Sequence, residues 1–207
     1  MLEDIERERA GRGAVGAVSE LNVFPVKGMR GNRLETANVL QSGILGDRLA
    51  MLTDPDGMFI TQRGLAALAT INARWDGDEL VVSAGERSVR VAFDRDAPRR
   101  RVTVWRSTVD ALAAAEGADA AVSDLVGREV RVVTLDPADP RPVNPDFTQR
   151  QEYTAFADGY PLLLANAASL DDLCLRMVEA GGEGVPMARF RPNIVVRGAP
   201  AWAEDTW

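Results

Sequence analysis

The chain has 207 residues, 46% of them hydrophobic, which is enough to bury a core in one large domain or two small ones. Its net charge of -7 argues against broad nucleic-acid binding, which needs a basic face. It has no histidine and a single cysteine, which excludes zinc and iron–sulfur sites, Ser-His triads and Cys-His dyads built from this chain alone. No apolar run is long enough for a bilayer and no signal peptide is recognisable, so we expect a cytoplasmic protein without membrane contact.

The first half of the chain predicts short strands separated by turns. Residues 1–13 are charged and lack apolar periodicity, which indicates a flexible arm. Asp54-Pro55-Asp56-Gly57 and Asp76-Gly77 are typical turn sequences between strands. The expected strands are residues 18–26, 34–40, 49–53, 71–75, 80–82, 89–93 and 102–104. This density favours an α+β, mainly β fold with a curled antiparallel sheet or barrel over a doubly wound fold.

The second half mixes helices, strands and a proline-rich segment. Residues 107–127 are rich in alanine and predict one or two helices broken near Gly117, followed by a strand at 130–135. Clustered prolines predict a stiff linker at 136–147, between a first region at 14–135 and a second at 148–207. In the second region Ser169 is expected to cap a helix that ends at Gly181-Gly182, and 193–196 predicts a last strand.

Two basic residues near strand ends are candidates for binding an anion. Lys27 is the only lysine in the chain. At a strand end it can serve as a point charge for phosphate or, if desolvated, as an amine nucleophile; the alternative is an exposed turn lysine. Arg48 closes the segment Gly43–Arg48, whose glycines allow close approach of a ligand and whose arginine offers a planar fork for phosphate. The alternative there is a bulged turn held by contact between Asp47 and Arg48.

A third polar group lies before the last expected strand. If residues 188–193 are extended, alternation places Arg189, Arg191 and Asn193 on one side, where they suit an anionic, heteroaromatic ligand. The alternative is a solvated face whose arginines pair with Asp158 or Glu183. Cys174 lies on the apolar face of the expected helix, which indicates a small packing residue and not a metal ligand.

An ordered set of motifs resembles the MOSC family, and most closely its amidoxime-reducing branch with an N-terminal β-barrel region. The similarity runs from about residue 18 to the last residue, and Phe-Arg-Pro-Asn followed by Glu-Asp-x-Trp is its most specific part. The matching motifs are Pro25-Val26-Lys27, Gly46-Asp47-Arg48, Thr61-Gln62-Arg63, Trp105, Asp158-Gly159-Tyr160-Pro161-Leu162, Ala168-Ser169-Leu170, Arg189-Phe190-Arg191-Pro192-Asn193 and Glu204-Asp205-Thr206-Trp207.

The resemblance implies a fold, a cofactor and a reaction. It implies an N-terminal β-barrel-like region at 14–135 followed by an incomplete MOSC β-barrel domain at 148–207. It also implies a molybdenum cofactor, a pterin whose phosphate is held by basic side chains. The implied reaction is reduction of N-hydroxylated compounds with electrons from a separate redox protein. Carried over by position, the cofactor-binding residues would be Lys27, Arg48, Arg191 and Asn193, with Ser169 near the pocket rim; no catalytic residue and no metal ligand is assigned.

The sequence departs from the family pattern in two places. Gly28-Met29 stand where relatives often have Ser-Cys, so backbone replaces one side-chain contact. Relatives also continue beyond the Glu-Asp-x-Trp motif to a cysteine that binds molybdenum, so we expect this chain to be the front part of such a protein. Incomplete pairing of terminal strands predicts self-association.

Three other interpretations remain open. The chain could be a molybdenum-cofactor carrier or binding module without chemistry of its own, because it has phosphate-type contacts and lacks the metal ligand. It could hold pyridoxal phosphate as a Schiff base at Lys27, since no other lysine competes. It could also be an inert β-rich domain.

Overall fold

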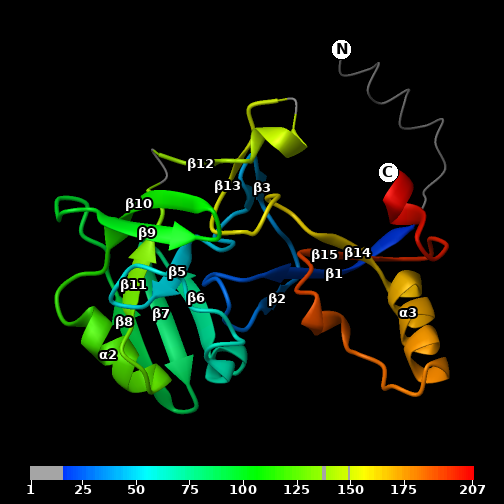
Figure 1. Cartoon of the computed structure of the whole chain (residues 1–207), viewed down its shortest axis with the longest axis horizontal. Helices are drawn as coiled ribbons and strands as arrows, with labels where there is room; N and C mark the ends of the chain where they lie inside the picture. Colours follow the sequence, from blue (N-terminus) through cyan, green and yellow to red (C-terminus); the bar gives the residue numbers. More distant parts are fainter. Residues whose placement is uncertain (1–15, 137–138, 149) are drawn as a thin grey trace. The chain divides into compact units, whose positions relative to one another are not determined.

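A computed structural model describes residues 16–136, 139–148 and 150–207, and the chain divides into two compact units (Figure 1). Unit 1 combines Met1–Leu21 with Leu163–Trp207, and unit 2 is the continuous stretch Asn22–Leu162. The flexible arm expected at residues 1–13 lies outside the described residues. The mainly β, α+β character predicted from the sequence is confirmed.

Two antiparallel sheets and one helix form most of unit 2. The four-stranded sheet has the order β5 (Ala50–Thr53), β11 (Arg131–Thr134), β10 (Ser107–Ala113) and β9 (Arg100–Val104). The three-stranded sheet has the order β6 (Asn72–Asp76), β7 (Glu79–Ala84) and β8 (Arg87–Val91). Figure 1 shows α2 (Ala118–Val126) beside β8, and it also packs against β7 and β11.

Shorter elements of unit 2 position the loops that carry polar residues. They are β2 (Asn32–Leu34), β3 (Val39–Leu40), β4 (Gly43–Ile44), β12 (Arg141–Pro142), β13 (Tyr153–Thr154) and the 3-10 helices η1 (Ala66–Ala69) and η2 (Pro145–Phe147). β3 pairs with β4 and β12 pairs with β13, both antiparallel. β12 and η2 therefore lie inside the segment that the prolines predicted to be a linker.

The core of unit 2 consists of two apolar clusters. The larger one fills the space between the three-stranded sheet and α2, with Leu80, Val82, Val91 and Val122 fully buried. The smaller one surrounds Phe156 beside the four-stranded sheet. Burying each such side chain contributes about 1.5–3 kcal/mol, and β7 contributes three consecutive buried residues, Leu80, Val81 and Val82.

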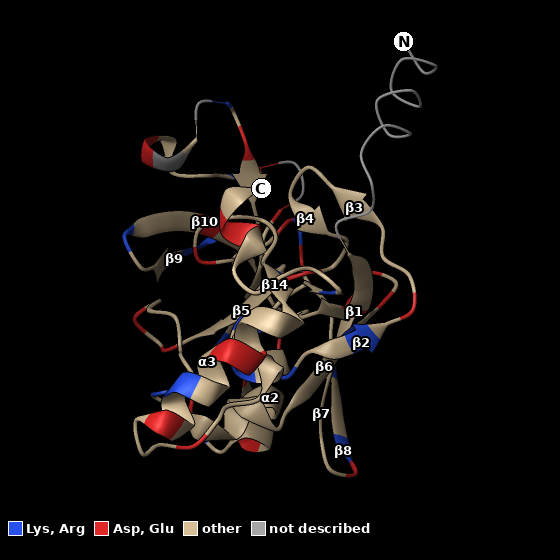
Figure 2. Ribbon diagram, turned by 90° about the vertical axis from the view of Figure 1, so that its right-hand side faces the viewer, with Lys and Arg blue, Asp and Glu red and all other residues tan. Residues whose placement is uncertain are grey.

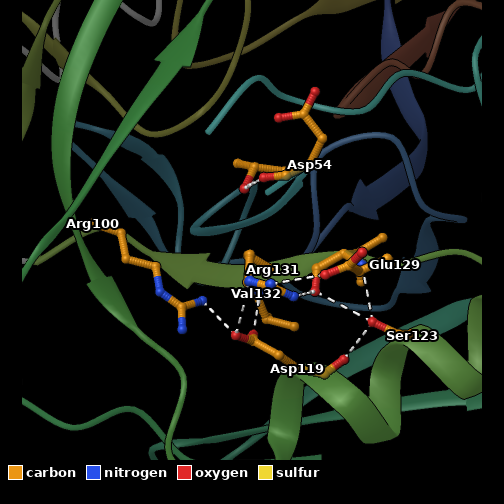
Figure 3. A network of polar contacts seen from close by, with 9 residues as sticks. Asp54, Arg100, Asp119, Ser123, Glu129, Arg131 and Val132 are labelled. Atoms are coloured by element: carbon orange, nitrogen blue, oxygen red, sulfur yellow. Dashed lines mark hydrogen bonds and ion pairs between the residues drawn. The ribbon is translucent and has the colours of Figure 1, made fainter. Parts of the chain in front are cut away.

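A polar network fastens the start of α2 to two strands (Figure 3). The carboxylate of Asp119 accepts a hydrogen bond from the backbone N–H of Val132 at 2.8 Å. It also forms an ion pair with Arg100 at 2.6 Å, and Arg131 lies 3.9 Å away. The hydroxyl of Ser123 donates to the carbonyl oxygen of Asp119 at 2.6 Å. One side chain therefore fixes the helix to both β9 and β11.

The helix expected at the beginning of residues 107–127 is wrong. Residues 107–113 form β10, which pairs with β9 from Ser107 to Ala111, and only α2 is helical. Ala111, Leu112 and Ala113 are buried within the sheet. Tertiary pairing thus overrides the helix propensity of alanine. The turn at Asp54–Gly57 is confirmed, because the N–H of Gly57 donates to the carbonyl of Asp54 at 3.1 Å.

Unit 1 is a small sheet with one long helix. β15 (Ile194–Arg197) pairs antiparallel with β1 (Ala17–Val23) and parallel with β14 (Leu164–Asn166). α3 (Ala167–Glu179) packs against β14 and β15, and η3 (Met187–Arg189) and η4 (Ala203–Thr206) complete the unit. Figure 2 shows acidic and basic residues together on α3, where Arg176 and Asp172 form an ion pair at 2.8 Å. Of the helices that the structure describes, none is long and apolar enough to cross a membrane.

Candidate functional site

Lys27 lies four residues after β1, is held by backbone contacts and points its amine into unit 2. Its N–H donates to the carbonyl of Ala50 at 2.8 Å, beside a bridge between Val26 and Ala50. Its amine donates to the carbonyl oxygen of Phe156 at 2.7 Å and to Oδ1 of Asp158 at 2.5 Å. Only 10% of the Lys27 side chain is exposed. The alternative of an exposed turn lysine is therefore wrong.

Asp158 accepts hydrogen bonds from two separate loops. Besides Lys27, the indole N–H of Trp105 donates to the same oxygen, Oδ1, at 2.7 Å. Trp105 lies in the turn between β9 and β10 with a φ of 54°, a left-handed conformation that is uncommon for a bulky residue. Its ring meets the ring of Phe59 edge-on, with centroids 4.9 Å apart. The Lys27 amine lies 5.3 Å from the Phe59 centroid.

Opposing electrostatic effects act on this pair. Burial lowers the pKa of Lys27, and Asp158 partly opposes that shift, while the nearby guanidinium groups of Arg141 and Arg48 lower the pKa further. Partial desolvation opposes the ionisation of Asp158, but hydrogen bonds from Lys27 and Trp105 outweigh it and lower its pKa. The carboxylate form of Asp158 is thus favoured beside Lys27, while burial and the two guanidinium groups oppose the positive charge of the Lys27 amine.

Arg48 lies in a turn that is fastened to both neighbouring segments. Its N–H donates to the carbonyl of Phe24 at 2.6 Å, and its carbonyl accepts from Phe156 at 2.9 Å. Its guanidinium pairs with Asp47 and lies 4.6 Å from the centre of the Phe24 ring. Asp47 in turn accepts from the N–H of Phe24 at 2.7 Å. The Asp47–Arg48 contact considered in the alternative interpretation is present, and it leaves Arg48 close enough to Lys27 to affect its pKa.

The glycines before Arg48 leave room for other parts of unit 2. A Cβ on Gly43 would lie 2.5 Å from the carbonyl oxygen of Pro161, and one on Gly46 would lie 3.0 Å from the Trp75 ring. The sequence predicted that these glycines allow a ligand to approach. In the structure, Gly43 lies against Pro161 and Gly46 lies against Trp75.

Arg141 is a buried cation that sequence reasoning missed. It lies on β12 with 8% exposure. Its Nε donates to the carbonyl of Ala155 at 3.1 Å, and its Nη2 donates to the carbonyl of Ala157. Burial lowers its pKa, and the charge of Asp158 opposes that effect. No spacing rule marks Arg141, because the proline-rich segment around it does not resemble a binding loop.

A cavity of about 980 Å³ lies beside Asp158 in unit 2, and neither Lys27 nor Arg48 lines it. Trp105, Arg141 and Asp158 contribute to its wall, together with Arg106 and Asn144. Lys27 has three N–H groups, and its contacts with the described residues use two of them. One N–H therefore remains for an anionic ligand.

The other three predicted residues belong to unit 1 and have structural contacts of their own. Asn193 is fully buried, and its side-chain oxygen accepts from the N–H of Leu163 at 3.1 Å. The Ser169 hydroxyl accepts from the N–H of Trp202 at 2.8 Å. Arg191 adopts a left-handed φ of 58° directly before Pro192.

Two local predictions about these residues are wrong. Ser169 does not cap the helix: α3 begins after Asn166, whose side chain accepts from the N–H of Ala168 at 3.1 Å. Arg189, Arg191 and Asn193 do not alternate along a strand, because η3 ends at Arg189 and β15 begins only at Ile194. Arg191, with its left-handed φ, lies in a turn between η3 and β15.

The donor groups fit the phosphate end of the implied cofactor. A buried ammonium with an unused N–H, set among arginines, matches an anionic oxygen. For a metal the described residues offer no cluster of three or more His, Cys, Asp or Glu side chains. Cys174 makes contacts with the N–H and the carbonyl of Val185, both at 3.4 Å, as expected for a packing residue.

Two domain families match the chain in succession. The description "MOSC N-terminal beta barrel domain" matches residues 15–129, and "MOSC domain" matches residues 151–207. The human protein named mitochondrial amidoxime-reducing component 1 is 32% identical over 213 residues, covering 93% of this chain and 59% of that protein. Human mitochondrial amidoxime reducing component 2 is 30% identical over 205 residues, covering 93% and 60%.

A fish protein of the same name is similar to this chain to a comparable degree. Mitochondrial amidoxime-reducing component 1 of Danio rerio is 29% identical over 210 residues, covering 93% of this chain and 62% of that protein. The chain thus spans less than two thirds of the length of these relatives. The two domain matches follow one another in the same order as the motifs read from the sequence, and the chain belongs to the MOSC family, in the branch that contains the amidoxime-reducing components.

Proposed function

We propose that this chain binds the molybdenum cofactor through its phosphate, with Lys27 and Arg48 as the contacts in unit 2. The observation that carries the proposal is the buried Lys27 amine, which has one N–H left over and two guanidinium groups close enough to lower its pKa. Asp158 pairs with Lys27 and Asp47 pairs with Arg48, whereas the buried Arg141 contacts carbonyl oxygens; a bound anion would compensate this third positive charge. Arg191 and Asn193, with Ser169 near the rim, are proposed as contacts from unit 1 on the strength of the family motifs alone.

The proposed contribution of the chain is binding and orientation. When bound, the cofactor would supply the oxygen-atom transfer chemistry. Lys27 would hold the phosphate as a point charge, and Arg48 would add a planar pair of donors. Asp47 would keep the Arg48 guanidinium aligned, because its carboxylate is 2% exposed and pairs with that group.

Elemental analysis tests cofactor binding directly. The chain would be purified from a host that makes the cofactor, beside the variants Lys27→Ala and Arg191→Ala and the control Arg95→Ala, whose side chain is exposed. We expect molybdenum in the wild type and the control, and its loss in Lys27→Ala. Loss in Arg191→Ala would support the proposed cofactor contact of Arg191. Equal molybdenum in all four proteins would rule out this site.

The reaction is a further part of the proposal. Relatives are named amidoxime-reducing components, so we propose that a protein of the relatives' full length reduces N-hydroxylated compounds. Two electrons and two protons would convert an amidoxime to an amidine and water, with electrons from a separate redox protein. Steady-state assays with a chemical electron donor and an amidoxime test this on the longer protein. A protein that carries molybdenum but gives no amidine would favour the carrier interpretation.

Pyridoxal phosphate is a second candidate because the pKa of Lys27 is lowered. A lysine with a lowered pKa is a better amine nucleophile. Against this, its contact with Asp158 favours the protonated amine. Adding pyridoxal phosphate and recording the absorption of a Schiff base, absent in Lys27→Arg, would support this candidate.

Location and assembly remain predictions. The cytoplasmic location expected from the sequence is tested by fractionating cells that express the tagged chain. Self-association through a strand edge is supported by β14, which lies at the end of its strand order and exposes 37% of Leu164. Sedimentation that changes with protein concentration would support it, and a monomer at every concentration would exclude it.

A further inference from the structure

Among the described residues that affect the pKa of Lys27, Asp158 favours the charged amine through a full negative charge. Burial disfavours the ammonium, and so do the positive charges of Arg141 and Arg48. The carbonyl oxygen of Phe156 offers only a dipole. Asp158 is the carboxylate that acts in the opposite direction, through both its hydrogen bond and its charge.

An exposed carboxylate is ordinarily a weak partner. The Asp158 side chain is 72% exposed, and such groups usually contribute little because they are solvated and free to rotate. Here a second donor restricts it, since the Trp105 N–H bonds to the same oxygen as Lys27. Trp105 is itself held by the edge-on contact with Phe59 and by a left-handed backbone.

We infer that Asp158, fixed by Trp105, is a positioning residue that keeps Lys27 protonated and aims its remaining N–H at the bound phosphate. The inference rests on the proposed phosphate-binding function of Lys27. It assigns Asp158 and Trp105 a task that the phosphate contacts themselves do not include. Neither side chain needs to touch the cofactor for this task.

The single lysine makes the inference measurable. In a chain labelled with ¹³C,¹⁵N-lysine, the one lysine side-chain signal comes from Lys27. Its chemical shift reports the protonation state, so a pH titration follows this amine without any ligand. The titration would be recorded for the wild type, Asp158→Asn, Trp105→Phe and a matched control, Asp78→Asn, which alters an exposed carboxylate in the β6–β7 turn.

We expect Asp158→Asn to move the Lys27 titration to lower pH, because the amide preserves the hydrogen bonds but removes the charge. Trp105→Phe should move it in the same direction by a smaller amount, and Asp78→Asn should leave it unchanged. A Lys27 titration in Asp158→Asn that coincides with the wild type would overturn the inference. If Asp158→Asn does not fold, the Lys27 titration of Trp105→Phe is compared with that of Asp158→Glu, which keeps the carboxylate.

Inorganic phosphate then separates the inference from the function on which it rests. In the wild type we expect phosphate to shift the Lys27 signal. At a pH between the measured Lys27 titration midpoints of the two proteins, we expect about tenfold weaker affinity in Asp158→Asn, because the variant amine is then neutral and its charge-assisted hydrogen bond is lost. If phosphate leaves the wild-type signal unmoved while Asp158→Asn still shifts the titration, the phosphate function fails and the inferred role of Asp158 survives. A normal phosphate response with equal affinity in both proteins would overturn the inferred role alone.

Discussion

The backbone N–H of Phe156 donates a hydrogen bond to the carbonyl oxygen of Arg48 at 2.9 Å. The carbonyl oxygen of Phe156 accepts from the Lys27 amine at 2.7 Å. One buried residue therefore holds both basic residues of the site, one through each side of its backbone. Its side chain is fully buried in the smaller core cluster and so anchors the backbone that contacts Lys27 and Arg48.

Replacing Phe156 with alanine should destabilise unit 2 and weaken the backbone contacts of this residue with Lys27 and Arg48. Removing a fully buried phenylalanine costs about 3–5 kcal/mol. The control Leu40→Ala, at a side chain that is 50% exposed, should cost less than about 1 kcal/mol. Urea unfolding followed by tryptophan fluorescence measures both values. Similar losses for the two variants would contradict the central place given to Phe156.

The stability of the chain should depend on Lys27 in alkaline solution. Folding lowers its pKa below 10.5, so between the lowered pKa and 10.5 the unfolded chain binds more protons than the folded one. The free energy of unfolding must therefore rise with pH across that window, and the destabilisation is fully present below it. Lys27→Met removes this contribution. Across the window the urea midpoint of the wild type should rise relative to that of Lys27→Met; a difference between the two midpoints that stays constant would contradict the lowered pKa.

Asp119 offers a test of the network that holds α2. Asp119→Ala removes the acceptor for the Val132 N–H and the partner of Arg100, and should cost about 1–3 kcal/mol. Asp119→Asn retains an acceptor oxygen and should lose less. Chemical unfolding of the two variants, compared at low and high salt, separates the hydrogen bond from the ion pair. Identical losses would show that the charge accounts for the whole effect.

Gly43 should tolerate no side chain. At a φ of 114° a Cβ is strained, and it would lie 2.5 Å from the carbonyl oxygen of Pro161. Gly85→Ala is a matched control, with a φ of 58° and nothing within 4 Å of the added atom. We expect a loss of about 1 kcal/mol in the control and clearly more in Gly43→Ala. Thermal unfolding of both variants provides the comparison, and equal melting temperatures would argue against the close approach.

Sequence reasoning was most successful where a local pattern decides the structure. An apolar run located β5, which is buried along its whole length, the Asp76-Gly77 turn located β6 and β7, and alternation located β9. The pattern failed at Ala111, where pairing with Arg100 decides the conformation. It also failed at Ser169, because a residue three positions earlier, Asn166, is the one with capping geometry.

The candidate site could be predicted only in part, because some of its contacts join residues far apart in the sequence. Lys27 was identifiable as the single lysine, and Arg48 by its motif. Asp158 belongs to a motif recognised by resemblance, but its contact with Lys27 joins residues 131 positions apart, which no local pattern encodes. Arg141 was missed because its importance depends on burial against the carbonyls of Ala155 and Ala157.

The two stretches that build unit 1 set an order for folding during synthesis. The Ser19 hydroxyl donates to the carbonyl of Val195, a contact between residues 176 positions apart, whereas unit 2 is one continuous stretch. A chain emerging from the ribosome can complete unit 2 before β15 exists, and β1 must wait for that partner. Ribosome-bound chains stalled just after Leu162 have left the exit tunnel should therefore already resist protease across unit 2.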